Sequence, residues 1–194
     1  MRLFVALDLD PAVRSAAAIL SEALRARARE QAPRARITWV APGRLHITLV
    51  FIGELDADRA AAVTAVLAPP LAMPPFIVEA AGVGAFPARG RPRVLWAGIE
   101  RGSGELAAIA ADVQRRLSSA GIAVEDRPLT PHLTLARVRD GIGLHPARLF
   151  AGFEDTALGE MTVSAITLFE SRLSPAGPQY QVMQQMVVTE EGAQ

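Results

Sequence analysis

The sequence predicts a single α+β domain built from two similar halves, each a mainly antiparallel sheet with helices on its outside. A chain of 194 residues, 51% of them hydrophobic, is long enough to bury one compact core. The order strand, helix, strand then occurs twice along the chain, as expected for a duplicated αβ unit. We therefore expect a bilobal domain over residues 1–194, with a pseudo-twofold axis, a central cleft and a flexible tail from about residue 189.

The first half begins with clear signals for a strand and a helix. Residues 2–9 form an apolar run typical of a central strand. Asp10 followed by Pro11 is typical of a helix N-terminus, and Pro33 lies beyond the end of that helix. The expected elements of this half are strands at 2–9, 37–40 and 45–52 and helices at 11–31 and 57–67.

The second half repeats this order. We expect Ser103 to cap its long helix and Gly121 to lie just past the end of that helix. The expected elements are strands at 76–83, 93–99, 122–124, 132–138, 161–173 and 179–188, helices at 105–119 and 146–150, and a loop at 84–92.

Composition excludes several classes of function. Twenty basic and twenty acidic residues cancel, so any site for an anion must be local. All twenty basic residues are arginine, which genomic base composition explains, although guanidinium groups also suit phosphate. The absence of cysteine excludes disulfides, thiolate metal sites and a cysteine nucleophile, and it suits a cytoplasmic protein. No stretch approaches the ~20 apolar residues of a membrane helix, so we expect no membrane partner.

One motif occurs in the third strand of both halves. The pattern His-x-Thr-Leu begins at His46 and again at His132, in a chain with only three histidines. Because successive side chains on a strand point to opposite faces, His46 and Thr48 share one face, and His132 and Thr134 do the same. If the twofold axis brings the strands together, two imidazoles and two hydroxyls line one cleft. An imidazole pair can act as general acid and general base, while the hydroxyls donate to a phosphate oxygen.

A metal site is the main alternative explanation for paired histidines. Zinc needs three or four ligands, but the remaining histidine, His145, precedes a proline in an expected loop. No carboxylate lies at ligand spacing from either motif, and Glu54 is interpreted as a turn or helix-entry residue. We therefore expect no metal and no other cofactor.

Further motifs give nearly the whole chain a resemblance to a known family. They are Trp39–Pro42, Phe51–Gly53, Phe86-Pro87, Pro92–Trp96, Pro131–Arg137 and Ser171–Leu173 with Gly177 and Tyr180. With the paired His-x-Thr-Leu motifs, they resemble the 2H phosphoesterase superfamily, and within it the RNA 2′,3′-cyclic phosphodiesterases, also called 2′-5′ RNA ligases. The resemblance implies metal-independent hydrolysis of a terminal 2′,3′-cyclic phosphate to a 2′-phosphomonoester, with a reverse ligation that forms 2′-5′ linkages. It also implies that His46 protonates the leaving 3′ oxygen and that His132 activates water.

Substrate-binding residues are expected beside the motifs. For Arg137 the resemblance favours a contact to phosphate, with a surface arginine as the alternative. Because it lies five residues after His132, it would need a β-bulge or a strand end to reach the histidine face. Arg44 is a candidate contact to an RNA backbone, with a solvated charge as the alternative. Phe51 is expected on the face of His46, where it could stack a base or pack in the core. For the loop arginines Arg89, Arg91 and Arg93, the same two alternatives apply, a contact to an RNA backbone or a solvated charge. The residues interpreted as structural are Trp39, Trp96, Ser171 and Tyr180.

Three functions are compatible with these features. The leading hypothesis is an enzyme, a monomer, that processes RNA ending in a 2′,3′-cyclic phosphate, such as tRNA halves or oligonucleotides. The second is a phosphodiesterase for small cyclic phosphates, such as ADP-ribose cyclic phosphate or cyclic mononucleotides. The third is a non-catalytic RNA-binding module, against which two intact motifs argue because a strand does not need either histidine.

Overall fold

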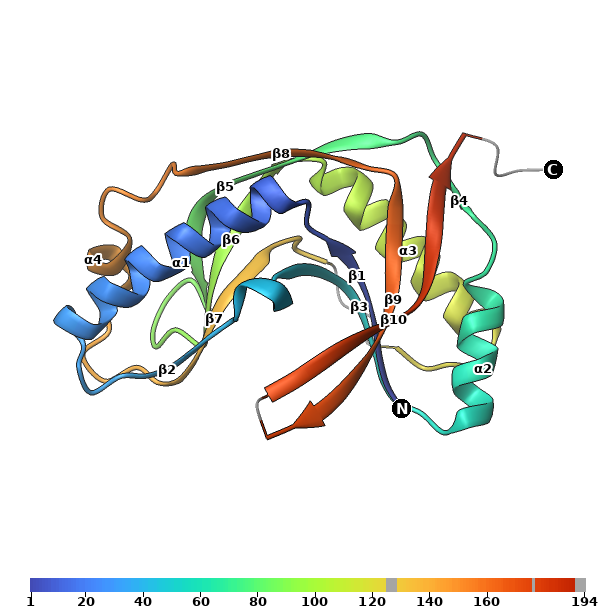
Figure 1. The fold of residues 1–194 in the computed structure, drawn as a ribbon, viewed down its shortest axis with the longest axis horizontal. Helices are drawn as coiled ribbons and strands as arrows, with labels where there is room; N and C mark the ends of the chain where they lie inside the picture. Colours follow the sequence, from blue (N-terminus) through green and yellow to red (C-terminus); the bar gives the residue numbers. More distant parts are fainter. Residues whose placement is uncertain (125–128, 176, 191–194) are drawn as a thin grey trace.

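The structure is a computed structural model that describes residues 1–124, 129–175 and 177–190. These residues form a mixed α+β fold around one ten-stranded, mostly antiparallel sheet (Figure 1). The two separate sheets expected from the sequence are thus one continuous sheet. The strands are β1 (Arg2–Asp8), β2 (Arg36–Trp39), β3 (His46–Glu54), β4 (Leu71–Ala72), β5 (Phe76–Phe86), β6 (Val94–Arg101), β7 (Leu133–Asp140), β8 (Ala157–Val163), β9 (Ala165–Ser174) and β10 (Gly177–Thr189). The helices are α1 (Pro11–Gln31), the short 3-10 turn η1 (Pro42–Arg44), α2 (Ala57–Val66), α3 (Ser103–Ser119) and α4 (Pro146–Phe150).

The strand order brings the two motif strands together in the middle of the sheet. The order is β4-β10-β9-β1-β3-β7-β6-β5-β8, with β2 paired to β7 off this path. Outward from the centre, one side therefore runs β3, β1, β9, β10 and the other runs β7, β6, β5, β8. Strands β3 and β7 share a single antiparallel register pair, Ile47 with Leu133, and both side chains are fully buried. Among the described strands, β3 and β7 therefore share the fewest register pairs of any neighbours in the sheet, at the point where the two motifs meet.

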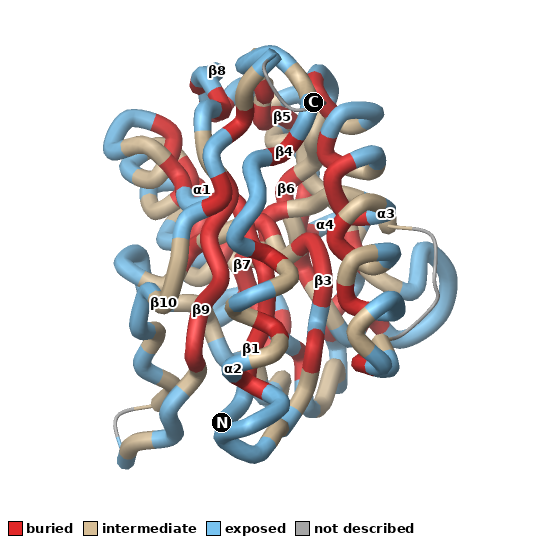
Figure 2. The backbone as a smooth tube through the Cα atoms, turned by 90° about the vertical axis from the view of Figure 1, so that its right-hand side faces the viewer, coloured by how far each residue is buried: buried red, intermediate tan, exposed pale blue. Residues whose placement is uncertain are grey.

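The two long helices connect the halves. Helix α1 follows the first strand but packs against β7, β8 and α4, whereas α3 packs against β3 and β6 (Figure 1). The start of α1 agrees with the sequence prediction, since the Asp10 carboxylate accepts a hydrogen bond from the Val13 amide at 2.8 Å and Pro11 lies in the first turn. Buried stretches follow the central strands and the inner sides of the helices (Figure 2). Each half thus contributes a helix to the core of the other.

The two faces of β1 pack into different parts of the molecule. Alternate residues of β1 belong to two different apolar clusters. Leu3, Val5 and Leu7 lie in the main core with the helices, whereas Phe4 and Ala6 form a smaller cluster with Phe169 and Tyr180. The His46 ring contacts this smaller cluster, so it lies on the side of β1 away from the main core.

Two expectations about strands are wrong. Residues 161–173 do not form one strand, because the chain breaks at Ser164 as it passes from β8, which pairs with β5, to β9, which pairs with β1 and β10. The expected strand at 122–124 does not form; the Ile122 amide instead donates to the carbonyl of Leu117 at the end of α3, and the Ile122 side chain is buried.

Glycines account for two further corrections. Strand β5 continues through Gly84 to Phe86, where the sequence predicts a loop. Gly84 lies against the Trp96 ring, and a methyl group there would clash with it, so this glycine permits close packing rather than a turn. Helix α3 begins at Ser103 with Gly102 as its N-cap at φ 84°, and the Ser103 hydroxyl donates to the Ile99 carbonyl instead of capping the helix.

At the C-terminus, β10 reaches Thr189, which pairs with Ala72 of β4, a strand that the sequence did not predict. Of the expected tail, residues 191–194 lie outside the described residues.

Truncating the β3–β7 contact should destabilise the whole molecule. We expect Leu133→Ala to lower the free energy of unfolding by about 2–5 kcal/mol, because it leaves a cavity at a fully buried position. Leu173→Ala is the matched control, since Leu173 is 80% exposed and its truncation should change stability by less than about 0.5 kcal/mol. Urea unfolding of both variants measures the difference, and equal stabilities would contradict the importance of this contact.

Candidate active site

The two His-x-Thr motifs face each other across the centre of the sheet. His46 is the first residue of β3, and His132 immediately precedes β7, which begins one residue later than the strand expected there. The antiparallel pair of Ile47 with Leu133 places His46 opposite Thr134 and Thr48 opposite His132. Diagonal neighbours across such a pair are about 7–8 Å apart, which leaves room for a tetrahedral anion between the imidazoles. The expected alternation is confirmed, because the histidines and threonines are half-buried while the residues between them are buried.

A β-bulge follows each motif. The register between β1 and β3 skips Leu49, and the register between β6 and β7 skips Leu135. In each case the skipped residue and its successor are both buried, so two consecutive side chains point into the core. Regular alternation would place Phe51 and Arg137, each five residues after a histidine, on the opposite face, so alternation was the wrong ground for expecting Phe51 on the face of His46. The bulges return both side chains to the histidine face, which confirms the condition that the sequence set for Arg137.

Hydrogen bonds fix which nitrogen of each imidazole faces the cleft. Nδ1 of His46 lies 2.8 Å from the Arg44 carbonyl oxygen, and Nδ1 of His132 lies 2.8 Å from the Thr130 carbonyl oxygen. A carbonyl only accepts, so Nδ1 is assigned as the donor in both rings. Nε2 is then the nitrogen that gains or loses a proton. In His46 it lies 3.0 Å from the Thr48 hydroxyl oxygen.

Burial lowers the pKa of both histidines. For His46, burial lowers the pKa below its ordinary value near 6.5, opposed first by the hydrogen bond to the Arg44 carbonyl and then by the Asp8 carboxylate, while the guanidinium groups of Arg137 and Arg14 add to the lowering. For His132, burial again lowers the pKa, the Thr130 carbonyl opposes the shift, and the Arg137 guanidinium adds to it. A carboxylate therefore favours the charged form of His46 but not that of His132.

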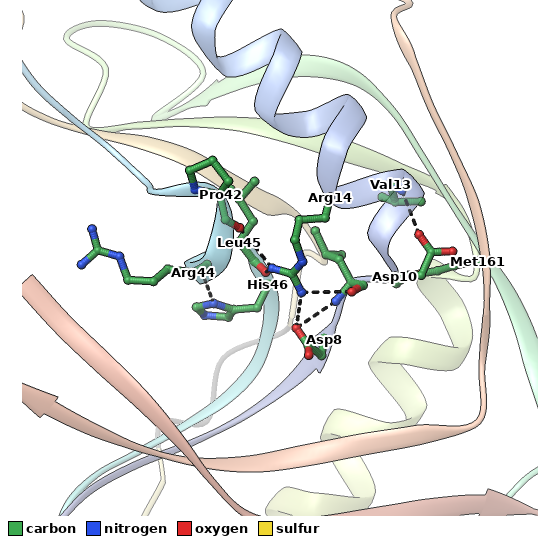
Figure 3. Close-up of polar contacts among 10 residues, drawn as sticks. Asp8, Asp10, Val13, Arg14, Pro42, Arg44, Leu45, His46 and Met161 are labelled. Carbon is green, nitrogen blue, oxygen red and sulfur yellow. Dashed lines mark hydrogen bonds and ion pairs between the residues drawn. The ribbon is translucent and has the colours of Figure 1, made fainter.

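Arg14 fixes the ends of the strands next to His46 (Figure 3). This arginine projects from α1 and reaches both the end of β1 and the turn before β3. Its guanidinium donates to the Asp8 carboxylate at 2.5 Å and to the carbonyl oxygens of Leu9, Pro42 and Leu45 at 3.0, 3.1 and 2.9 Å. Asp8 is in turn the register partner of His46. No sequence signal indicates this role, because an arginine in the first turns of a helix resembles an ordinary surface residue.

Aromatic side chains hold each imidazole edge-on. The Tyr180 ring centroid lies 5.2 Å from that of His46 at 89°, and the Phe86 centroid lies 5.0 Å from that of His132 at 84°. Phe4 also packs on His46, at 5.1 Å. Tyr180, interpreted from the sequence as structural, thus contacts a candidate catalytic residue. Phe86 belongs to one of the motifs that carry the family resemblance, but the sequence assigned it no role.

Two cavities share a wall made of the motif residues. One, of about 340 Å³, lies on the side of His132, and the other, of about 500 Å³, lies on the side of His46. The residues that line both are Thr48, Phe51, Thr134 and Arg137. Arg44 lines the larger cavity and donates to the Pro178 carbonyl at 3.2 Å. The loop arginines Arg89, Arg91 and Arg93 are exposed and line neither cavity.

The described part of the chain holds neither a cluster of metal ligands nor a membrane-spanning helix. Over residues 1–124, 129–175 and 177–190, no group of three or more His, Cys, Asp or Glu side chains is placed to hold a metal ion. Within the same residues, no helix has the length and apolar character to cross a membrane.

The fold and the site define an α+β protein with two histidines that face each other between two cavities. The chain belongs to the 2′-5′ RNA ligase superfamily, whose profile matches residues 11–174. It is 34% identical over 180 residues to an RNA 2′,3′-cyclic phosphodiesterase of Archaeoglobus fulgidus, covering 93% of this chain and 96% of the relative. It is 39% identical over 149 residues to an enzyme of the same name from Aeropyrum pernix, covering 76% of this chain and 84% of the relative.

Solved structures agree with the fold. The crystal structure of TT0787 from Thermus thermophilus superposes with a TM-score of 0.77 at 29% identity, covering 98% of this chain and all of the other. Escherichia coli LigT complexed with 3′-AMP superposes with a TM-score of 0.71, covering 97% of this chain and 98% of the other. At 23% identity, the second likeness concerns the fold alone.

The two histidines should titrate below their ordinary pKa in the ligand-free protein. We expect both midpoints below ~6.5, because burial disfavours the imidazolium. Asp8→Asn should lower the midpoint of His46 further and leave that of His132 in place, since only His46 has this carboxylate beside it. NMR titration of the imidazole resonances measures both. Asp58→Asn, at an exposed position on α2, is the control and should move neither.

Proposed function

We propose that the protein hydrolyses the terminal 2′,3′-cyclic phosphate of RNA to a 2′-phosphomonoester. The observation that carries the proposal is the placement of two Nε2 atoms, each fixed through Nδ1, beside one wall shared by two cavities. The relatives named RNA 2′,3′-cyclic phosphodiesterase support the substrate. We interpret the two halves as copies of one αβ unit within a single domain, which would explain why the acid and the base come from equivalent positions.

The reaction requires one neutral and one protonated histidine. His132 accepts a proton from water at Nε2 while the water oxygen bonds to phosphorus in line with the 3′ oxygen. The phosphorus–O3′ bond breaks, and His46 Nε2 donates its proton to O3′. The product keeps the 2′-phosphate and gains a 3′-hydroxyl. The same steps, with an RNA 5′-hydroxyl in place of water as the nucleophile, would form a 2′-5′ linkage, and the reverse of those steps would cleave one.

The surroundings of the histidines support this division of roles. Asp8, the register partner of His46, favours a charged imidazole there, as a general acid requires. For His132, burial lowers the pKa and no carboxylate among the described residues opposes it, which favours the neutral form that a general base requires, although the Arg137 guanidinium lowers the pKa of both histidines.

The shared wall suits the transition state. The hydroxyls of Thr48 and Thr134 and the guanidinium of Arg137 border both cavities and can donate to the nonbridging oxygens of the phosphate. Phe51, 54% exposed on the same face, offers a ring for stacking a base. With an acid, a base and donors in place, the mechanism needs neither a metal nor a covalent intermediate.

A second candidate function is hydrolysis of small cyclic phosphates. A cavity of about 340 or 500 Å³ lies within the usual range for small-molecule sites, which favours this alternative. Comparing a cyclic mononucleotide with an oligonucleotide that ends in a cyclic phosphate distinguishes the two.

Loss of either histidine should nearly abolish the chemical step. We expect His46→Ala and His132→Ala to slow single-turnover hydrolysis by about 10²- to 10⁴-fold, the usual contribution of a general acid or base. His145→Ala is the matched control and should keep the wild-type rate. Thr48→Val and Thr134→Val should cost less than either active-site histidine, because each removes one neutral donor among several.

The same assay tests the metal-free mechanism. Wild-type activity should persist after dialysis against EDTA. A loss that zinc or another divalent ion restores would contradict the proposal, as would more than about a tenth of the wild-type rate in either active-site histidine variant.

The rate should depend on pH with a maximum on the acidic side. In kcat/KM, the acid limb reports the histidine that must be neutral, and the alkaline limb reports the one that must be protonated. Because burial lowers both pKa values, we expect both limbs, and hence the maximum, to lie below ~6.5. Asp8→Asn should shift the alkaline limb to still lower pH. Profiles of kcat/KM between about pH 4 and 9 measure this, and a flat profile would exclude acid–base roles for both histidines.

A further inference from the structure

We propose that the RNA strand ending in the cyclic phosphate lies in the cavity on the His46 side. There, Arg2 and Arg44 bind the phosphate that links its last two nucleotides. The inference rests on the proposed function and adds the direction of the strand and the residues that select oligonucleotides over mononucleotides.

The charges of the two cavities differ. The cavity on the His46 side is lined by Arg2 and Arg44 in addition to the shared Arg137, and by no acidic residue among the described ones. On the His132 side, the described lining residues include no cation besides Arg137. A neighbouring hollow that also reaches His132 is lined by aromatic rings and Glu100. An internal phosphodiester is therefore favoured on the side of His46.

The geometry of displacement at phosphorus connects the position of the RNA strand to the roles of the two histidines. Water attacks in line with the bond that breaks, so the nucleophile and O3′ lie on opposite sides of the phosphorus. O3′ belongs to the ribose that continues into the rest of the RNA strand. If that strand occupies the cation-lined cavity, O3′ is directed toward His46 and water enters beside His132. The charge distribution thus leads independently to His46 as the acid and His132 as the base.

The two arginines differ in how they are held. Arg44 is half-buried, donates to the Pro178 carbonyl and packs against Gly177, so it is fixed to the β9–β10 hairpin. Arg2 is exposed at the start of β1 and makes no side-chain hydrogen bond or ion pair with any described residue. Its guanidinium is thus available to a phosphate without breaking an existing contact.

The hairpin forms an apolar wall beside these cations. Leu173, Pro178 and Tyr180 line the same cavity, and Leu173 is 80% exposed. In Figure 1 the hairpin of β9 and β10 projects away from the helices. An apolar wall beside arginines suits a nucleotide, whose base packs on side chains while its phosphate pairs with guanidinium groups.

The opposite strand direction is the competing arrangement. Arg89, Arg91 and Arg93 lie on the loop between β5 and β6, next to Phe86 on the His132 side. They line neither of the two cavities that share the motif wall, but a strand running toward His132 would pass this loop. Substitution of Arg91 therefore tests the alternative.

The experiment compares a dinucleotide with a mononucleotide, both ending in a 2′,3′-cyclic phosphate. We expect wild-type kcat/KM to be higher for the dinucleotide. Arg2→Gln and Arg44→Gln should each lower the ratio of dinucleotide to mononucleotide kcat/KM by about tenfold, the order expected for a charge-assisted phosphate contact. Arg91→Gln and the control Arg59→Gln, an exposed position on α2, should leave that ratio unchanged.

A crosslink gives a readout that does not depend on activity. An oligonucleotide with 4-thiouridine next to its 3′-terminal nucleotide, ending in a cyclic phosphate, is irradiated with His132→Ala to prevent turnover. We expect the crosslinked peptide to contain residues of the 171–180 hairpin. A crosslink to residues 86–96 would overturn the assignment.

The outcomes separate the two proposals. If the wild-type protein hydrolyses neither substrate, the proposed function fails. If it hydrolyses both but the ratio does not change in Arg2→Gln and Arg44→Gln, or falls only in Arg91→Gln, the function stands and the strand direction is wrong.

Discussion

The site depends on one pair of residues, Ile47 and Leu133, the only register pair between β3 and β7 within the described residues. Because the pair is antiparallel, it sets each histidine opposite the threonine of the other motif. A shift of one strand by one residue would place the two motifs on opposite faces of the sheet. A single buried contact can fix this register because α1 and α3 cross over and pack on the strands of the opposite half. The apolar core on one face thus determines the geometry of the polar site on the other.

The two β-bulges extend this symmetry to residues that differ. Phe51 and Arg137 occupy equivalent positions, five residues after each histidine, and both line the two cavities. One position supplies a ring and the other a charge. The same holds around the imidazoles, where Asp8 stands beside His46 and, among the described residues, no carboxylate shifts the pKa of His132. A near-symmetric scaffold therefore holds two histidines that burial keeps neutral, and only His46 has a carboxylate that opposes this effect.

The sequence predicts the motif geometry well because it depends on local alternation. His46 and Thr48 share a face whatever the rest of the chain does. Arg14, Phe86 and Tyr180 could not be assigned in this way, because their roles arise from contacts between elements distant in the chain. The strand order was also beyond local signals. Residues 161–173 read as one strand, and only the pairing of β8 with β5 and of β9 with β1 explains the break at Ser164.

Burial of the histidines opposes one half of the chemistry and assists the other. In the ligand-free protein, a lowered pKa suits the base, His132, but leaves less of the acid, His46, protonated. A cyclic phosphate bound between the rings carries a negative charge, which stabilises an imidazolium beside it. Asp8 favours His46 as the site of that charge, since Arg137 lowers the pKa of both histidines and only His46 has a carboxylate to oppose it. The substrate's own charge would thus complete the protonation state that the reaction needs.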